Sequence, residues 1–428
     1  MGVMFDWGFR GLTALTELLL NPFYYVGILF IVLQYRRQIL LERRLFSTKL
    51  HSLISETWRT VLWGWIGGLA ASAVMAGIGA VVQPEAVVLL WIVSLLLIWV
   101  RVRFLCWAYA VGVLGMLQAL LVSFPALQEA VTWRWAIDSL LALHMPSLFA
   151  LVAVLHLVEA LLVRRQGTRF GTPVFVESKR GKIVGGYQLQ GFWPMALFLT
   201  VPVQGGGVPL PWTPLLGGDL WAGGWTLLAL PVMIGFTDMT TSRLPREKVQ
   251  LSSGLLVLYA ALLLLLTVLS VWWAPSLLAV SLLCILLHEA IVFYSRWDES
   301  RRSPVFVHGS KGLKILGILP GSPAAELGLQ VGESLYKVNG TAVRTKQEIH
   351  QALSQNAAFC RLEILNLAGE SKFVKRAIFS GEHHLLGIIL APDADVMYYV
   401  KEKPLPFWAY LGRRVKGLSD NRPRPKSM

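Results

Sequence analysis

The sequence predicts an α-helical membrane bundle followed by a smaller cytoplasmic α+β domain, on three observations. Charged residues form only 15% of the 428 residues and apolar residues 55%, whereas soluble domains carry roughly 25% charged residues. Runs such as Gly254–Trp273 approach the ~20 apolar residues that a membrane-spanning helix needs. After residue 297 these runs give way to short alternating segments separated by turn residues. We therefore expect a membrane domain at 1–297, a folded domain at 298–398 and a basic aromatic tail at 399–428.

The apolar segments predict seven to nine membrane spans. The first segment is interrupted at Asn21-Pro22, and the third and sixth are short, so the count stays open within that range. The segments lie near residues 12–35, 61–83, 86–100, 104–124, 137–163, 188–203, 220–236, 252–273 and 276–294.

The distribution of basic residues predicts the orientation of the spans. Lys and Arg cluster after the first, fifth and seventh segments, while the loops at 82–85, 204–219 and 274–276 contain neither. Because cytoplasmic loops carry the excess of Lys and Arg, the basic loops and the region after the last span are expected in the cytoplasm. Nine spans would place the N-terminus outside. Eight spans, with residues 1–35 as a surface or re-entrant element, would place it inside.

The net charge of +14 follows mostly from these loops. The basic residues are spread over the chain rather than gathered on one soluble face, which argues against nucleic acid as a partner. The tail combines Lys and Arg with Phe407, Trp408 and Tyr410, a composition that suits an anionic bilayer surface. Beyond Lys416 a disordered solubilising tail is an equal alternative.

The segment from Gly312 to Gly340 carries the most specific motif of the chain. Apolar residues alternate into a turn, a short Ala-rich helix follows, and a second alternating run closes on Asn-Gly, which favours a tight hairpin turn. This pattern resembles a PDZ domain of the bacterial type. The matching positions are Gly321, Ser322, Pro323, Ala324, Gly328, Leu329, Gly332, Glu333, Asn339 and Gly340, with Leu335 where the pattern prefers Ile.

The resemblance also implies a peptide-binding groove of the permuted type. In PDZ domains of the site-2-protease type, a terminal strand with an L-G-I element forms the binding edge and the carboxylate loop. Such an edge binds a peptide or protein segment as an added strand. A helix over 345–356 would form the opposite wall, on which Ile349 and Leu353 face either the core or the groove. The edge and loop would be Leu385, Leu386, Gly387 and Ile388, where Gly387 would let a ligand backbone approach.

Site-2-type metalloproteases also combine membrane helices with PDZ domains, but no such enzyme is predicted here. Their H-E-x-x-H motif places two imidazoles on one helical face to bind zinc. Here His288-Glu289 is followed by Val292 in the second histidine position, and the L-D-G and G-x-S-x-G motifs are absent. The three cysteines, Cys106, Cys284 and Cys360, lie far apart and show no metal spacing. We expect no catalytic residue, no metal and no cofactor.

Ionisable residues inside the spans allow two interpretations. His156 and Glu159 lie three residues apart, with Asp138 and His144 earlier on the same segment. Such residues are costly in hydrocarbon and usually face a bundle interior. They indicate either a polar pocket in a transporter or, as we favour, hydrogen bonds that hold the helices together. The small residues at 67–77 would allow close packing.

Two similar segments follow helices that leave the membrane through basic loops. Thr172-Pro-Val-Phe-Val precedes a Lys-Ile run, and Ser303-Pro-Val-Phe-Val precedes another. Either an ancestral unit was repeated or short apolar strings converged by chance. If the repeat is real, the hairpin at 174–188 would form a cytoplasmic β-ribbon able to dock on the PDZ domain.

The architecture as a whole resembles the MinJ family of Gram-positive rods. Multiple spans, basic cytoplasmic loops, one C-terminal PDZ domain and the opening pattern Asn21-Pro-Phe-Tyr-Tyr followed by Tyr35-Arg-Arg carry this resemblance. It implies a non-enzymatic adaptor for cell division in the bacterial membrane, at septum and poles, that links a DivIVA-like scaffold to a MinD-like ATPase. The alternatives are an inactive site-2-protease-like regulator of intramembrane proteolysis and a PDZ-regulated transporter.

Overall fold

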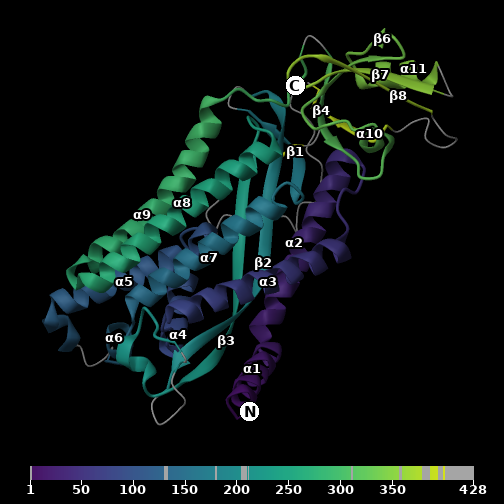
Figure 1. Cartoon of the computed structure of the whole chain (residues 1–428). Helices are drawn as coiled ribbons and strands as arrows, with labels where there is room; N and C mark the ends of the chain where they lie inside the picture. Colours follow the sequence, from purple (N-terminus) through teal and green to yellow (C-terminus); the bar gives the residue numbers. More distant parts are fainter. Residues whose placement is uncertain are drawn as a thin grey trace, which may run out of the picture.

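The computed structural model describes two regions joined by the end of a long helix (Figure 1). The described residues are 2–129, 134–178, 181–203, 210, 212–309, 312–355, 359–377, 386–393 and 399–400. The first region contains α1 (Gly2–Leu20), α2 (Pro22–Phe46), α3 (Leu53–Ile78), α4 (Pro84–Ile98), α5 (Trp107–Ser123), α6 (Arg134–Leu141), α7 (Met145–Gln166), β1 (Gly171–Glu177), β2 (Ile183–Pro202), β3 (Trp225–Thr240), α8 (Pro245–Trp272) and α9 (Leu277–Arg301). The second contains β4 (Leu313–Ile318), α10 (Pro323–Glu326), β5 (Ser334–Val338), β6 (Thr341–Ala342), α11 (Lys346–Ser354), β7 (Phe359–Leu365), β8 (Ser371–Ala377) and β9 (Ile388–Leu390).

Four helices in the described part of the chain are long and apolar enough to cross a membrane, namely α3, α7, α8 and α9. The pair α1 and α2 passes the same test together, bent by 55°. The bend lies at Asn21, whose extended backbone precedes Pro22 and whose side chain accepts a hydrogen bond from Phe23 N–H as the cap of α2. The interruption expected at Asn21-Pro22 is therefore confirmed. The helices α4 and α5 are apolar but shorter.

The expectation of helical spans at 188–203 and 220–236 is wrong, because these segments form strands β2 and β3. The two strands pair in antiparallel register from Tyr187 opposite Thr240 to Pro202 opposite Trp225. A short apolar run fits a buried strand as well as a buried helix, so periodicity alone could not separate them. Pro194 and Pro231 would each interrupt a helix, whereas aromatic and β-branched neighbours favour a strand.

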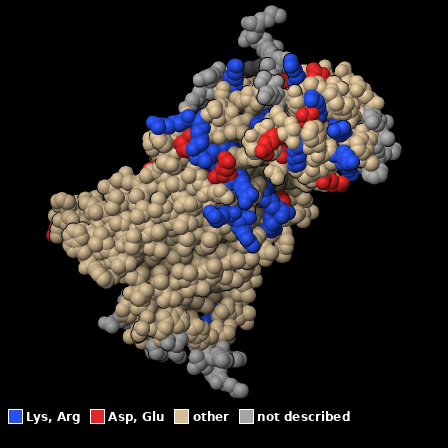
Figure 2. Space-filling model, turned by 45° about the horizontal axis from the view of Figure 1, so that its top comes forward, with Lys and Arg blue, Asp and Glu red and all other residues tan. Residues whose placement is uncertain are grey.

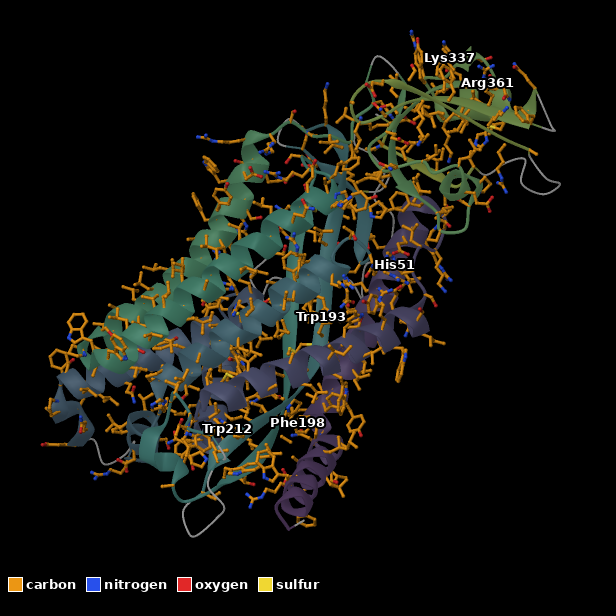
Figure 3. The ribbon with its side chains drawn as sticks, in the orientation of Figure 1. His51, Trp193, Phe198, Trp212, Lys337 and Arg361 are labelled. Atoms are coloured by element: carbon orange, nitrogen blue, oxygen red, sulfur yellow. The ribbon has the colours of Figure 1, made fainter. Side chains whose placement is uncertain are left out.

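The β2–β3 hairpin runs alongside the helices from the PDZ side to the opposite end of the bundle (Figure 1). Trp193 and Phe198 follow one another along β2 toward Trp212 at that far end (Figure 3). Trp212 Nε1–H donates a hydrogen bond to Ala76 O at the end of α3, 3.2 Å away. The hairpin therefore covers the same length as the helices that surround it.

A row of small residues on α3 covers the open edge of β2. β1 pairs with β2 only as far as Leu189. Beyond it, a Cβ atom added at Gly64 would lie 2.3 Å from the carbonyl oxygen of Pro194, and one at Gly68 would lie 2.3 Å from that of Ala196. One turn later on α3, Ser72 Oγ accepts a hydrogen bond of 2.8 Å from the next outward-facing amide of β2.

The spacing of the contact residues along α3 matches the spacing of the outward-facing residues along β2. Four helical residues rise about 6 Å, and two strand residues rise about 6.6 Å, so each turn of α3 meets the next outward-facing residue of β2. Because an open strand edge is not tolerated in hydrocarbon, this contact lets a strand lie inside the bundle. The close packing expected from the small residues at 67–77 occurs, and its partners are the strand β2 at Gly68 and Ser72 and the helix α7 at Gly67, where an added Cβ would lie 2.9 Å from the Val158 side chain.

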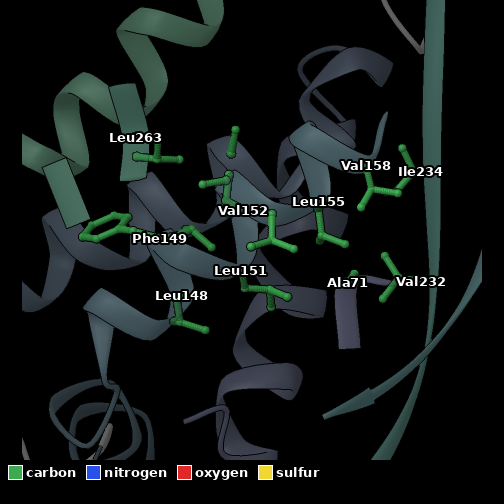
Figure 4. Close-up of a cluster of buried hydrophobic side chains, with 14 of the residues drawn as sticks. Ala71, Leu148, Phe149, Leu151, Val152, Leu155, Val158, Val232, Ile234 and Leu263 are labelled. Carbon is green, nitrogen blue, oxygen red and sulfur yellow. The ribbon is translucent and has the colours of Figure 1, made fainter. Parts of the chain in front are cut away.

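The helix α7 is the centre of the membrane region, and its apolar side chains are buried on nearly all sides, with Leu161 exposed. Figure 4 shows Leu148, Phe149, Leu151, Val152, Leu155 and Val158 of α7 among side chains of α3, β3 and α8. Such burial explains why α7 is apolar on all sides over Leu148–Leu155, without the polar face of a surface helix.

Substitution of Gly68 tests the α3–β2 contact. Gly68→Ala places a Cβ against the backbone of Ala196, so α3 has to move away and stability should fall by about 1–3 kcal/mol. Gly77→Ala on the same helix is the matched control, since no atom lies within 4 Å of its added Cβ. That control should be neutral or stabilising by up to ~1 kcal/mol. Both effects are measured by unfolding the purified chain in detergent, and equal stability of the two variants would contradict the contact.

Candidate functional site

The C-terminal region folds around its own core. Its sheet has the order β8-β7-β5-β4-β9, with β6 beside β5. Leu313, Ile315, Leu335, Leu362 and Ile364 are buried in this core and come from three neighbouring strands.

The Asn-Gly turn predicted at 339–340 is confirmed and has a second role. Asn339 and Gly340 both have positive φ, 50° and 88°, as a two-residue hairpin turn requires. The Asn339 side chain donates to Ala352 O (2.9 Å) and accepts from Arg361 N–H (2.8 Å). One residue therefore joins the turn, the helix α11 and the strand β7.

The strand β9 occupies one edge of the sheet, as expected for a peptide-binding edge. It pairs with β4, with Ile388 opposite Ile318. Gly387 O accepts from Leu319 N–H (2.8 Å), and Ala391 N–H donates to Lys314 O (2.9 Å). Because strand residues alternate, the polar backbone groups of Ile388 and Leu390 face away from β4.

Gly387 has a structural role that the sequence analysis did not anticipate. Its φ is +75°, and an added Cβ would lie 2.2 Å from the Ser322 side chain. The conformation and the close approach within the domain both require glycine. A bulky residue at 387 would thus strain the fold instead of selectively blocking a ligand.

The remaining expected groove residues lie at or near the core. Leu386 and Ile388 are half-buried and pack against the domain core, and the carbonyl oxygen of Leu386 accepts from Ala324 N–H (2.9 Å). Ile349 and Leu353 on α11 are 8% and 5% exposed within that core. Of the two alternatives for these helix residues, burial favours the core. Leu385 lies outside the described residues.

The PDZ region docks on the β1–β2 hairpin. Gly185 N–H donates to Phe306 O (3.0 Å), and a Cβ at Gly185 would lie 2.8 Å from the Phe306 side chain. On β1, Phe175 is the partner of the same glycine. The Tyr187 hydroxyl donates to Leu316 O on β4. Phe175, Tyr187, Phe306, Leu316 and Ile389 form one buried cluster, which we call the junction cluster.

The junction places the two similar Pro-Val-Phe-Val segments around one glycine. Phe175 belongs to the first segment and Phe306 to the second, and both lie opposite Gly185. The expectation that the hairpin at 174–188 docks on the PDZ domain is met in the structure. The common origin of the segments stays a prediction.

Polar residues at the PDZ end of the bundle fix the strand β3 to α8 and α9. Glu299 Oε1 accepts from the backbone N–H of Thr241 (2.6 Å) and Ser242 (2.8 Å). Arg243 forms a bidentate pair with Asp298 at 2.7 and 3.0 Å. Val305 N–H donates to Thr241 O (2.9 Å) in the segment that leads to β4. The path from α9 to the PDZ region is therefore held by hydrogen bonds.

Basic residues gather over this end of the molecule. Figure 2 shows Lys and Arg over the PDZ region and the adjoining end of the bundle, while the rest of the visible bundle surface is largely uncharged. The uncharged surface has the composition of a lipid-facing region, and the basic end has that of a cytoplasmic face.

A buried charged pair joins the helix α2 to the loop between α2 and α3. His51 pairs with Glu42 and its Nε2 lies 2.9 Å from Arg169 O, so both ring nitrogens face acceptors. Burial lowers the pKa of His51, but the hydrogen bond and charge of Glu42 outweigh it, and the net pKa is raised above 6.5. The protonated ring connects α2 to the start of β1.

This pair predicts a pH dependence of stability. A histidine whose folded-state pKa is raised stabilises the fold below its unfolded pKa and loses that effect as pH rises through the folded pKa. We expect thermal stability in detergent to be highest below the ordinary histidine pKa of about 6.5 and to fall as pH rises through the raised folded-state pKa of His51. Glu42→Gln should flatten this part of the curve, and an unchanged pH profile in that variant would contradict the assignment.

The structure gives the polar residues inside the bundle different roles. His144 caps α7 by accepting from Ser147 N–H (3.3 Å). Glu289 pairs with Arg103 (2.9 Å) and accepts from the Tyr109 hydroxyl (2.7 Å). These hydrogen bonds and this ion pair hold the helices together, as the favoured alternative expects.

Sequence reasoning missed one grouping of three side chains. Cys106, His156 and His288 come from the start of α5, from α7 and from α9, and their ligand atoms lie within 4.8 Å of one another. The expectation of no metal rested on cysteine spacing and on the missing second histidine of H-E-x-x-H, neither of which tests a grouping drawn from three helices. No local spacing in the sequence marks it.

Comparisons with known proteins agree with this architecture. A model of the PDZ domain family matches residues 314–365. The protein named cell division topological determinant MinJ from Bacillus subtilis (strain 168) is 26% identical over 390 residues, covering 91% of this chain and 96% of that protein. The probable cell division topological determinant MinJ of Lacticaseibacillus paracasei is 26% identical over 364 residues, covering 82% and 90%. No solved structure gives a significant match.

The resemblance to the MinJ family is confirmed. An alignment of 390 residues is too long to be confined to the PDZ region and includes the membrane bundle. The relatives carry the name of a cell division determinant and not of an enzyme.

Proposed function

We propose that the chain is a membrane-anchored adaptor that takes part in the choice of the cell division site. The observation that carries this proposal is a PDZ sheet whose edge strand β9 has no second strand partner among the described residues, held against the basic end of a membrane bundle. The names of the relatives support the same process. Neither the inactive-protease nor the transporter alternative has comparable support.

In the topology that we propose, the basic end with the PDZ domain lies in the cytoplasm. The strands β2 and β3 then replace two of the expected helical crossings without changing the orientation. The chain passes between the two faces through α1 with α2, α3, α7, β2, β3, α8 and α9, and also through α4 and α5 if that pair reaches across. On this proposal the passages number seven, or nine with α4 and α5, and the N-terminus lies outside.

The PDZ domain, proposed to be of the permuted bacterial type and to extend over 298–398, would receive a partner segment along β9. Ile388 and Leu390 turn their backbone polar groups away from β4, so an added strand would pair there. By resemblance to the MinJ family, we propose a DivIVA-like scaffold and a MinD-like ATPase as the partners, at septum and poles. Anchoring in the membrane raises their effective concentration, and anionic lipid would attract the basic face.

Removal of one edge amide tests this mode of binding. Ile388→Pro deletes the N–H that points away from β4, so the β4–β9 ladder stays paired and an incoming strand loses a backbone hydrogen bond. Because such a bond contributes about 1 kcal/mol, affinity should fall at least about fivefold. The measurement is binding of the purified DivIVA-like and MinD-like proteins of the same organism to the full chain in anionic nanodiscs.

Ile388→Val is the matched control, because it keeps both the amide and a β-branched side chain. It should bind like the wild type. Wild-type affinity of a folded Ile388→Pro chain for both partners would contradict binding at β9 and point to the membrane loops instead.

A further inference from the structure

The grouping of Cys106, His156 and His288 has the form of a metal site. Cys106 Sγ lies 3.4 Å from His156 Nε2 and 3.7 Å from His288 Nε2. Zinc bonds of about 2.3 Å to sulfur and about 2.05 Å to nitrogen at a tetrahedral angle place these atoms about 3.6 Å apart. The two distances bracket that value.

The partners of both histidines fix the tautomer that binds metal. His156 Nδ1 lies 2.7 Å from Val152 O, and since a carbonyl only accepts, Nδ1 carries the proton. The Tyr109 hydroxyl donates to Glu289, so its oxygen accepts from His288 Nδ1–H, 3.0 Å away. Each ring therefore directs an unprotonated Nε2 toward Cys106. This is the arrangement by which outer hydrogen bonds orient histidine ligands in metal sites.

The Cys106 thiol cannot donate a hydrogen bond to both imidazoles at once. Cys106 has one hydrogen to donate, whereas two Nε2 lone pairs face it. A cation between the three atoms would satisfy both nitrogens and the sulfur at once. His156 is 3% exposed, and the ring of Tyr259 lies 4.8 Å and 5.5 Å from the two imidazoles, between centroids.

A buried carboxylate near the grouping also favours a bound cation. Glu159 lies three residues after His156 on α7, on the same face, and is 8% exposed. Within the described residues it has neither an ion pair nor a hydrogen bond. A buried carboxylate without a partner is costly. A divalent ion bound by one thiolate leaves a net charge of +1, which Glu159 would balance.

We propose that Cys106, His156 and His288 bind one zinc ion, with a water molecule in the fourth position. Zinc fits because one thiolate and two imidazoles are ligands it favours, and three protein ligands with a water are a known zinc arrangement. On binding, the Cys106 thiol loses its proton to solvent as the sulfur–zinc bond forms. The ion would join the start of α5 to α7 and α9.

Metal analysis of the purified full chain tests this proposal. The chain is purified with a histidine-free tag and without chelator, and zinc is measured by mass spectrometry of the elements. We expect about one zinc per chain, falling below about a tenth in Cys106→Ser, His156→Gln and His288→Gln. Cys284→Ser is the matched control and should keep its zinc, since Cys284 is buried nearby against Ala108 O and Tyr259 but lies outside the grouping.

Cobalt loading of the unaltered chain is a second test, and it does not depend on whether any variant folds. After the metal is removed with a chelator, Co²⁺ should give a thiolate-to-metal absorption band, and zinc should abolish that band by competition. The proposal is overturned if the wild type holds no zinc and shows no such band, or if folded Cys106→Ser and both histidine variants keep the ion. It is also overturned if Cys284→Ser, and not Cys106→Ser, loses it.

Discussion

The backbone hydrogen bonds of β2 are the constraint on which the rest of the structure depends. A strand of 20 residues that passes through an apolar bundle must pair both of its edges. β3 satisfies one edge, and β1 followed by α3 satisfies the other. The contact with α3 requires glycine at 64 and 68 and a hydroxyl at 72, because any larger side chain would separate helix and strand. These three residues therefore make a strand possible where a helix would be the usual solution.

The same strand connects the membrane bundle to the PDZ domain. Its start carries Gly185 and Tyr187, which bind Phe306 and the carbonyl oxygen of Leu316, and its far end lies at the opposite side of the bundle. The position of the PDZ domain thus depends on the β1–β2 hairpin in addition to the end of α9.

Sequence reasoning succeeded where the signal is local and failed where it is not. The PDZ domain was predictable because Asn339 and Gly340 mark a turn that few other residues can form. The strands β2 and β3 were not, since an apolar run between charged loops has the same composition as a helix. The junction was partly predictable from the two similar segments, while the need for Gly387 to contact Ser322 depends on the folded domain. The three side chains at Cys106 come from separate helices, and only the folded bundle brings them together.

Disulfide scanning of the hairpin tests the central claim most directly. Because Phe198 turns its amide toward α3, residues 196, 198 and 200 form non-hydrogen-bonded pairs with β3. Cysteine pairs at these positions should all cross-link in the membrane, as identified by peptide mapping, while a pair at 196 and 227 lies four residues out of register and should not. Two helices would instead cross-link at every third or fourth residue, and that pattern would contradict the account. The pairs expected to form are Ala196 with Pro231, Phe198 with Ala229 and Thr200 with Leu227.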